Sequence, residues 1–359
     1  MKKIIKIILI NFSIFCTIFV TLELFFQIGY FLKHDNFLFV EYDLDINNDI
    51  FEIHPYLGAR LKKSIAIEKN EIKITSTSFH TRWTGAPKNT DSLVRIAIFG
   101  GSTTFGTGVT DKDTWPALLQ EKLGRKYAVM NYGIPGYSTA ENIIQMSLVA
   151  PEKKPDIVIF YEGWNDIRNY HDKDLGSDYY SHGMQQYTNL GITIQHTRFD
   201  FFNNTFATFH LAVLIGRKVF KKITPKKDVS FTYADAFVDS IYKRNLETLK
   251  LLAKPNSYSI FIPQILNYES FLKNGESSFP WSKSIKNKSL PKLMGNFNNI
   301  MEGLCNVKDK KDCIVLNEVL ELEWSDEDFV DNGHFSRKGG MKMAELTESN
   351  IIVISKNLR

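Results

Sequence analysis

The N-terminal stretch "IILINFSIFCTIFVTLELFFQIGYFL" is apolar nearly all round, unlike the one-sided stripe of a helix on a soluble domain. It is long enough to cross a bilayer core of roughly 30 Å. Lys2, Lys3 and Lys6 precede it and favour an inner location for the N-terminal end. Because no small-residue cleavage site follows, we expect residues 1–34 to be an uncleaved single-pass transmembrane anchor rather than a removed signal. The alternative is a core helix of a soluble domain.

Two polar residues, Glu23 and Gln27, interrupt the later part of this stretch. A carboxylate within a membrane helix is costly unless it reaches water or a polar partner. We therefore expect Glu23 either to extend to the outer interface or to pack against a partner.

The pattern changes twice after the anchor. Residues 35–92 contain short alternations such as "SIAIEKNEIKITSTSFHTRW", which predict a membrane-proximal, β-containing segment. Residues 93–359 alternate apolar runs with amphipathic ones, and this order predicts an α/β domain with a central parallel sheet. Residues 171–230 break that order, so we interpret them as an insertion that could cover a substrate cleft.

Charge adds one local feature. The chain has 44 basic and 40 acidic residues, a formal net charge of +4 that is too weak and scattered for a nucleic-acid surface. A basic cluster follows an apolar segment within the insertion, and it is either a solvated helix face or a contact for anionic lipid or an acidic glycan. Its members are Arg217, Lys218, Lys221, Lys222, Lys226 and Lys227.

Cys305 and Cys313 lie in "LCNVKDKKDCIV", a spacing that can close a disulfide in an oxidising compartment. The alternative is a pair of unrelated loop thiols. No group of histidines and other ligands has metal-site spacing, and we expect neither a metal nor another cofactor.

The loop in "RIAIFGGSTTFGTG" follows a buried strand and could hold a phosphate or present a nucleophile. A phosphate loop requires lysine where Thr107 stands, and a dinucleotide loop requires glycine where Asp111 stands. The elbow of α/β-hydrolases requires glycine where Thr104 stands. What remains is Ser102, a candidate nucleophile at the carboxyl end of the first parallel strand.

Three later stretches add groups that acyl transfer needs. "NYGIPGYS" contains Gly136, whose backbone N–H could face the cleft, and "YEGWND" contains the amide of Asn165. Near the C-terminus, "VDNGHFSRKGG" places Asp331 three residues before His334, so one loop can carry a base and the carboxylate that orients it. Asp166 is more consistent with a structural role in its loop.

Together these blocks resemble the SGNH hydrolase superfamily, also called GDSL-type esterases, and in particular its membrane-anchored bacterial members with a "GGSTTFG" first block. The resemblance spans about residues 94–355. It implies a flavodoxin-like three-layer fold with a triad of Ser102, His334 and Asp331. It also implies an oxyanion hole built from the backbone N–H groups of Ser102 and Gly136 and the Asn165 side chain.

The first block departs from the family pattern in two places. The aspartate that commonly precedes the nucleophile is Gly101 here, and the leucine that commonly follows it is Thr103. The hydrogen bonds that support this loop must therefore differ, and substrate preferences of the soluble lipases do not transfer.

Three function classes follow from the resemblance. The leading one is a membrane-anchored esterase that removes a small acyl group, in particular O-acetyl, from an envelope glycan or another small ester. The others are an O-acyltransferase that uses the same triad and a non-catalytic glycan-binding relative. The expected location is the bacterial inner membrane, with the catalytic domain outside and with proteins of envelope polysaccharide assembly as possible partners.

Overall fold

The computed structural model divides the described chain into two compact units. One consists of Met1–Asp49 with Thr193–Asp228, and the other of Ile50–Ile192 with Val229–Arg359. The structure describes residues 2–34, 37–41, 50–90, 93–171, 202, 205–223, 235–273, 289–305 and 312–358.

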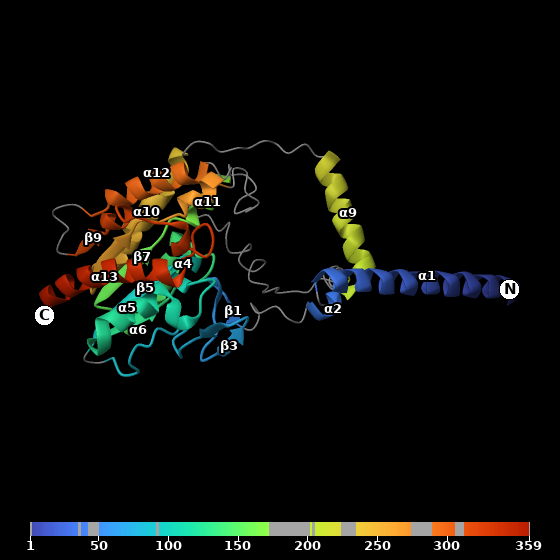
Figure 1. Ribbon diagram of the computed structural model, residues 1–359, viewed down its shortest axis with the longest axis horizontal. Coiled ribbons are helices and arrows are strands. Elements are labelled where there is room, and N and C mark those ends of the chain that lie inside the picture. Colours follow the sequence, from blue (N-terminus) through green and yellow to red (C-terminus); the bar gives the residue numbers. More distant parts are fainter. Residues whose placement is uncertain are drawn as a thin grey trace. The chain divides into compact units, whose positions relative to one another are not determined.

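A five-stranded parallel sheet forms the centre of the larger unit (Figure 1). Its strand order is β6-β5-β7-β8-β9, so the first strand along the chain lies between the second and the third. This is the flavodoxin-like order of a doubly wound sheet, and the predicted fold class is confirmed. The strands are β5 (Val94–Gly100), β6 (Tyr127–Asn131), β7 (Ile157–Tyr161), β8 (Tyr258–Ile262) and β9 (Cys313–Val315).

Both faces of the sheet are buried, which explains why its strands are apolar runs rather than alternations. Ile96 and Ile98 of β5 belong to one core, and Ala97 and Phe99 belong to the other. The first core is closed by α5 (Trp115–Leu123) and α13 (Arg337–Asn357). The second is closed by α6 (Thr139–Lys153), α10 (Ala236–Ala253) and α12 (Leu290–Glu302).

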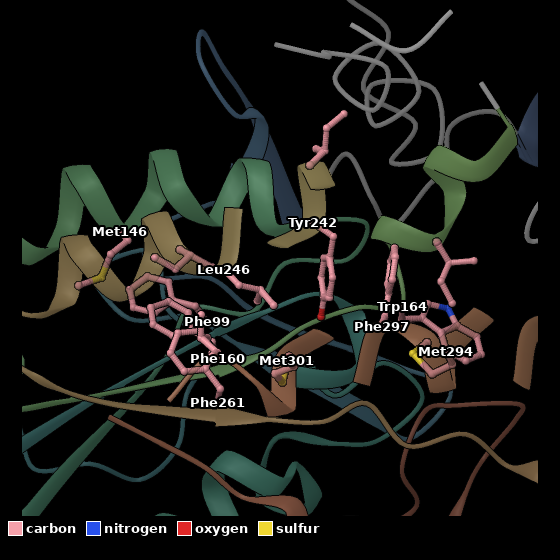
Figure 2. Close-up of a cluster of buried hydrophobic side chains, with 14 of the residues drawn as sticks. Phe99, Met146, Phe160, Trp164, Tyr242, Leu246, Phe261, Met294, Phe297 and Met301 are labelled. Atoms are coloured by element: carbon pink, nitrogen blue, oxygen red, sulfur yellow. The ribbon is translucent and has the colours of Figure 1, made fainter. Parts of the chain in front are cut away.

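Three phenylalanines at matching positions fix the register of the central strands (Figure 2). Phe99, Phe160 and Phe261 come from β5, β7 and β8, and neighbouring ring centroids lie 5.6 Å and 5.0 Å apart. Burying each such ring stabilises the fold by about 1.5–3 kcal/mol. A slip of one residue would move all three rings to the opposite face.

Two antiparallel hairpins precede the sheet in the same unit. β1 (Phe51–His54) pairs with β2 (Gly58–Leu61), and β3 (Ala66–Lys69) pairs with β4 (Ile72–Thr75). The chain then runs through Arg82, whose backbone bridges to Asn131 at the end of β6. The hairpins are thereby joined to the edge of the sheet.

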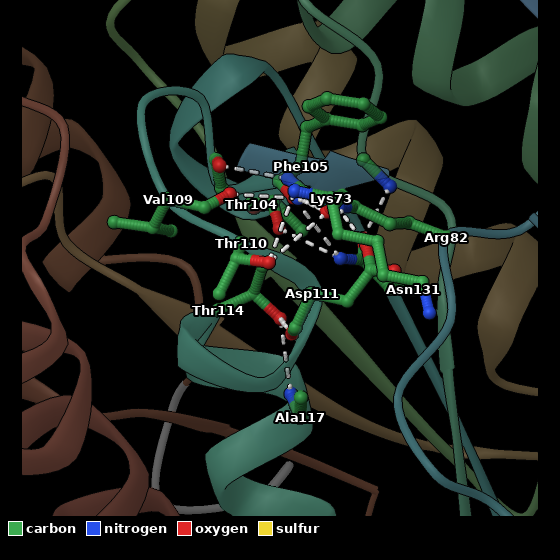
Figure 3. Close-up of polar contacts among 12 residues, drawn as sticks. Lys73, Arg82, Thr104, Phe105, Val109, Thr110, Asp111, Thr114, Ala117 and Asn131 are labelled. Carbon is green, nitrogen blue, oxygen red and sulfur yellow. Dashed lines mark hydrogen bonds and ion pairs between the residues drawn. The ribbon is translucent and has the colours of Figure 1, made fainter. Parts of the chain in front are cut away.

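The Arg82 side chain is fully buried and binds the loop that follows the first parallel strand (Figure 3). Its Nε donates to Asp111 Oδ1 at 2.9 Å, and its guanidinium carbon lies 4.6 Å from the centre of the Phe105 ring. A planar guanidinium can satisfy several acceptors at once, so one side chain organises the whole loop. The carbonyl groups that also accept from it are those of Lys73, Phe105, Gly106 and Val109.

The smaller unit contains α1 (Lys2–His34), α2 (Leu38–Glu41) and α9 (Ala207–Ile223). Within α1, residues 3–33 contain an 18-residue window with a mean hydropathy of 2.3, and the segment is long and apolar enough to cross a membrane. α1 is therefore a candidate membrane span. Residues 172–201, where the insertion was expected to cover a cleft, lie outside the described part, as do Lys226 and Lys227.

Cys305 and Cys313 are joined by a disulfide whose Cα atoms lie 5.7 Å apart. Cys305 follows α12, and Cys313 begins β9, the edge strand of the sheet. The bond therefore ties the end of a covering helix to the sheet edge. Cys16 in α1 is a free thiol.

Arg82→Lys should lower the free energy of unfolding by about 3 kcal/mol, because lysine retains the charge but cannot reach the same buried acceptors. The measurement is urea unfolding of the full chain held in detergent micelles. Arg95→Lys is the matched control, because Arg95 pairs with Asp156 in a partly exposed position, where exposed pairs contribute less than about 1 kcal/mol. Equal losses in the two variants would contradict the organising role of Arg82.

Candidate active site

Ser102 begins α4 (Ser102–Phe105), a single turn that follows β5 directly. Gly106 ends the turn with a φ of 88°, a left-handed conformation that favours glycine. The preceding Gly101 packs so closely that a Cβ there would overlap the amide nitrogen of Asn165 and lie 3.1 Å from the Tyr137 carbonyl oxygen. This position has no space for a side chain, which explains why glycine stands where the family commonly has aspartate.

His334 connects Ser102 to Asp331. Its Nε2 lies 2.7 Å from Ser102 Oγ, and its Nδ1 lies 2.6 Å from Asp331 Oδ2. Both distances are those of hydrogen bonds. The structure therefore brings the three predicted side chains into one chain of contacts, although serine and histidine are 232 residues apart in sequence.

The carboxylate of Asp331 is held by its own loop as well as by the imidazole. Its Oδ1 accepts hydrogen bonds from the backbone N–H groups of Gly333 at 2.9 Å and His334 at 2.8 Å. Burial acts to raise the pKa of Asp331, but the hydrogen bond and charge of His334 and these backbone donors together lower it below the usual value. The side chain is therefore ionised at neutral pH and suited to orient a histidine.

The buried indole of Trp164 packs against the histidine loop. A Cβ at Gly333 would lie 3.1 Å from the Trp164 ring, so the loop backbone lies directly on the indole. Val330 N also donates to His334 O at 2.9 Å, which closes the loop into a short antiparallel bridge. Packing and backbone hydrogen bonds together fix the position of the imidazole.

The predicted Gly136 lies in a tight turn after β6. Tyr137 N donates to Ile134 O at 3.1 Å, and Gly136 has a φ of 86°. Proline followed by glycine at the two central positions is the signature of a type II turn. The hydrogen bond of this turn uses the N–H of Tyr137 rather than that of Gly136.

Asn131 and Asn165 join the nucleophile turn to its surroundings. Asn131 Nδ2 donates to Thr104 O at 3.0 Å, and its Oδ1 accepts from Gly133 N at 2.9 Å. Asn165 is buried against Gly101 and donates through Nδ2 to Tyr137 O at 2.8 Å. Asn165 is thus placed between the serine turn and the Gly136 turn, beside the two backbone segments expected to contribute N–H donors.

Three buried carboxyl groups, those of Glu141, Glu162 and Asp166, lie near the Gly136 turn. Of these, only Asp166 was considered from the sequence. Asp166 accepts from Thr139 N at 3.1 Å and from the Thr139 hydroxyl, Glu162 accepts from Asn142 at 2.6 Å, and Glu141 accepts from Ser138 N at 2.8 Å. Burial raises the pKa of Asp166 to about 7 and raises that of Glu162 well above its usual value. Neutral forms are favoured because like charges share a dry site.

Among the described residues, no three histidine, cysteine or acidic side chains are arranged to hold a metal ion. The proximity of Ser102, His334 and Asn165 instead matches what acyl transfer requires: a hydroxyl, an adjacent base and an amide donor.

Comparison with known families identifies one segment. Residues 98–203 match the model of the GDSL-like lipase/acylhydrolase family. This segment contains Ser102, Gly136 and Asn165, whereas Asp331 and His334 lie beyond it and are brought to it by the fold. No curated protein matches the chain.

Several solved structures are similar at low identity. TesA is 15% identical with a TM-score of 0.42, covering 72% of this chain and 99% of its own. A lipase/acylhydrolase from Enterococcus faecalis is 14% identical with a TM-score of 0.40, covering 72% and 95%. Est24, a carbohydrate acetylesterase from Sinorhizobium meliloti, is 12% identical with a TM-score of 0.41, covering 72% and 99%.

Because these TM-scores are below 0.5, the solved structures do not support a family assignment. The assignment rests on the matched segment alone. That segment begins within β5 and includes the serine turn and the loops that contain Gly136 and Asn165. Residues 98–203 of the chain therefore carry a GDSL-like lipase/acylhydrolase domain, the type of domain found in SGNH ester hydrolases.

Proposed function

We propose that the chain is a membrane-anchored serine esterase in which Ser102, His334 and Asp331 act as a catalytic triad. The observation that carries the proposal is the pair of contacts at His334, 2.7 Å to Ser102 Oγ and 2.6 Å to Asp331. Ser102 Oγ attacks the ester carbonyl while His334 Nε2 takes its proton and then delivers it to the leaving alcohol. Water, activated by the same imidazole, releases the acid from the serine.

The negative charge that develops on the carbonyl oxygen is held by three N–H donors. These are the backbone N–H groups of Ser102 and Gly136 and the side-chain amide of Asn165. The Asn165 amide nitrogen has two hydrogens, and the Tyr137 carbonyl uses one of them. The second hydrogen is available to the oxyanion, and the first fixes the direction in which it points.

Asp166 acts as a positioning residue for the Gly136 turn. It binds the backbone N–H and the hydroxyl of Thr139, three residues after the glycine, while neighbouring Asn165 binds Tyr137. Asn165 and Asp166, which are adjacent in sequence, thus hold the chain at two points after Gly136. The orientation of the Gly136 N–H therefore depends on both side chains.

The acyl group is small, and the substrate is an O-acylated glycan of the cell envelope. Ser102 and His334 are each only 7% exposed, so the nucleophile lies in a confined place that suits acetyl better than a long acyl chain. The candidate membrane helix, preceded by lysines, favours a catalytic unit on the outer side of the bacterial inner membrane. Acylated envelope polysaccharides and the proteins that assemble them are accessible to an enzyme held there.

Ser102→Ala should lower the hydrolysis of a chromogenic acetyl ester by about 1,000-fold or more and abolish labelling by a serine-directed phosphonate. Ser147→Ala, which changes an exposed serine on α6, is the control and should retain both properties. The wild-type enzyme should prefer acetyl over octanoyl esters and release acetate from an acetylated polysaccharide.

Each readout tests a different part of the proposal. Phosphonate labelling of the alanine variant would remove Ser102 from the nucleophile position. Octanoyl preference would exclude the small acyl group. Acetyl groups that accumulate on an added sugar in place of free acetate would establish transfer instead of hydrolysis.

Asn165→Ala should lower kcat by about 100-fold to 1,000-fold with little change in KM, because its amide stabilises charge that exists only in the transition state. Steady-state kinetics on the acetyl ester test this, with circular dichroism to verify folding. A folded variant with unchanged kcat would show that Asn165 is not an oxyanion donor.

Asp166→Asn should flatten the pH dependence of stability. The folded-state pKa of about 7 lies above the ordinary value of 3.8, so between these pH values the folded protein binds more protons than the unfolded chain. Stability therefore falls as pH rises through this window, by on the order of 2–4 kcal/mol from this group.

Urea unfolding at about pH 5 and about pH 8 measures the effect. The wild type should be less stable at the higher pH, and Asp166→Asn should lose much of that difference. Glu318→Gln, which changes an exposed carboxyl outside the cluster, serves as the control. The same slope in wild type and Asp166→Asn would place the titration elsewhere.

A further inference from the structure

Two polar residues of the apolar helix α1, Glu23 and Gln27, bind the beginning of α9 and the residues just before it. The Glu23 carboxylate accepts hydrogen bonds from the backbone N–H groups of Ala207 at 2.7 Å and Thr208 at 2.9 Å, and from the Thr208 hydroxyl. These N–H groups belong to the first turn of α9, where a helix has no internal acceptors. A carboxylate there also meets the positive end of the helix dipole.

Gln27, one turn further along α1, completes the contact. Its Nε2 donates to Thr205 O at 2.9 Å, and its Oε1 accepts from Leu38 N at 3.1 Å. Two ring pairs lie on either side: Phe19 with Phe206, with centroids 5.9 Å apart, and Tyr30 with His210, 6.1 Å apart. The beginning of α9 is therefore fixed to one level of α1, and Figure 1 shows α9 running away from that point.

The level of Glu23 along α1 places this contact near the outer membrane surface. From Lys6 to Glu23 the helix rises about 25 Å at 1.5 Å per residue, against a hydrocarbon core of roughly 30 Å. If Lys6 marks the inner boundary, α9 begins at the outer boundary of the core. This step rests on the membrane anchoring proposed above.

The composition of α9 fits that place. Its first part, Ala207–Gly216, is apolar but rises only about 15 Å, too short to cross a bilayer. Leu214 and Ile215 are 41% and 53% exposed in the structure. The rest of the helix brings four basic residues in sequence, Arg217, Lys218, Lys221 and Lys222.

We propose that α9 is an interfacial helix that Glu23 fixes to the anchor, with its apolar part in the outer bilayer surface and its basic part on anionic lipid headgroups. Helices that combine apolar side chains on one face with lysine and arginine on the other lie in a membrane interface. A lipid surface is favoured over an acidic glycan because it covers Leu214 and Ile215 as well as the basic residues.

The test uses the full chain in vesicles of phosphatidylcholine with or without phosphatidylglycerol. An environment-sensitive fluorophore is attached at Ile215→Cys in a Cys16→Ser background. Its emission should shift to the blue in vesicles, more strongly with phosphatidylglycerol, and lipid-attached quenchers should reduce it. Leu251→Cys on α10, also an exposed leucine of a helix, should retain an aqueous spectrum.

Two further changes test the basic residues and the Glu23 contact separately. Replacing Arg217, Lys218, Lys221 and Lys222 by glutamine should remove the dependence on phosphatidylglycerol, at about fivefold in surface affinity per residue. Glu23→Ala should weaken the docking, read from the loss of a disulfide between Phe19→Cys and Phe206→Cys that forms readily when Glu23 is present.

An aqueous spectrum at position 215 in both vesicle types would overturn the proposal. A label on the native Cys16 then separates the causes, because an apolar spectrum there would leave the anchor in place, whereas an aqueous one would remove the anchor as well. A blue shift produced by a soluble acidic polysaccharide without lipid would also overturn it, in favour of a glycan contact. Esterase activity is measured independently of all these readouts.

Discussion

The burial of one sheet on both faces is the constraint on which the rest of the structure depends. Parallel strands need crossover connections, so the carboxyl ends of all strands in such a sheet lie on the same side. Ser102 follows β5, the Gly136 turn follows β6 and Asn165 follows β7. All three therefore lie at the carboxyl ends of neighbouring strands. The stacked rings of Phe99, Phe160 and Phe261 keep these strands in register. Distant residues thus meet because the core allows only one alignment.

The sequence predicted the elements of this arrangement because each has a local signature. Apolar runs without alternation indicate strands covered on both faces, and a proline followed by glycine indicates the turn at Gly136. The rule that chemistry gathers at the carboxyl ends of parallel strands then placed Ser102 beside the later loops. The rule does not place His334, which lies well past the end of β9, so its contact with Ser102 at 2.7 Å is a result of the fold.

Other parts of the site could not be predicted because their partners are backbone atoms or distant side chains. Arg82 lies in a polar connector, and four of its acceptors are backbone carbonyl groups. Every residue has such a group, so the sequence cannot indicate which ones bind Arg82. Glu162 ends an apolar strand in the same block as Asn165, and only the fold shows that Asn142 is its partner. From the sequence, Gly101 is only a departure from the family pattern. The structure gives the reason, because Asn165 packs so closely that a side chain at position 101 cannot fit.

Carboxyl groups that bind the N–H groups at the start of a segment recur in both units. Glu23 binds the start of α9, Asp166 binds Thr139 at the start of α6, and Asp331 binds the loop of His334. Such donors favour the ionised form, yet the pKa of Asp331 is lowered while that of Asp166 is raised. The difference lies in the surroundings: Asp331 faces an imidazole, whereas Asp166 is fully enclosed near Glu141 and Glu162. The same contact therefore orients a histidine through an ionised carboxylate at one place and holds a turn through a carboxyl group of raised pKa at the other.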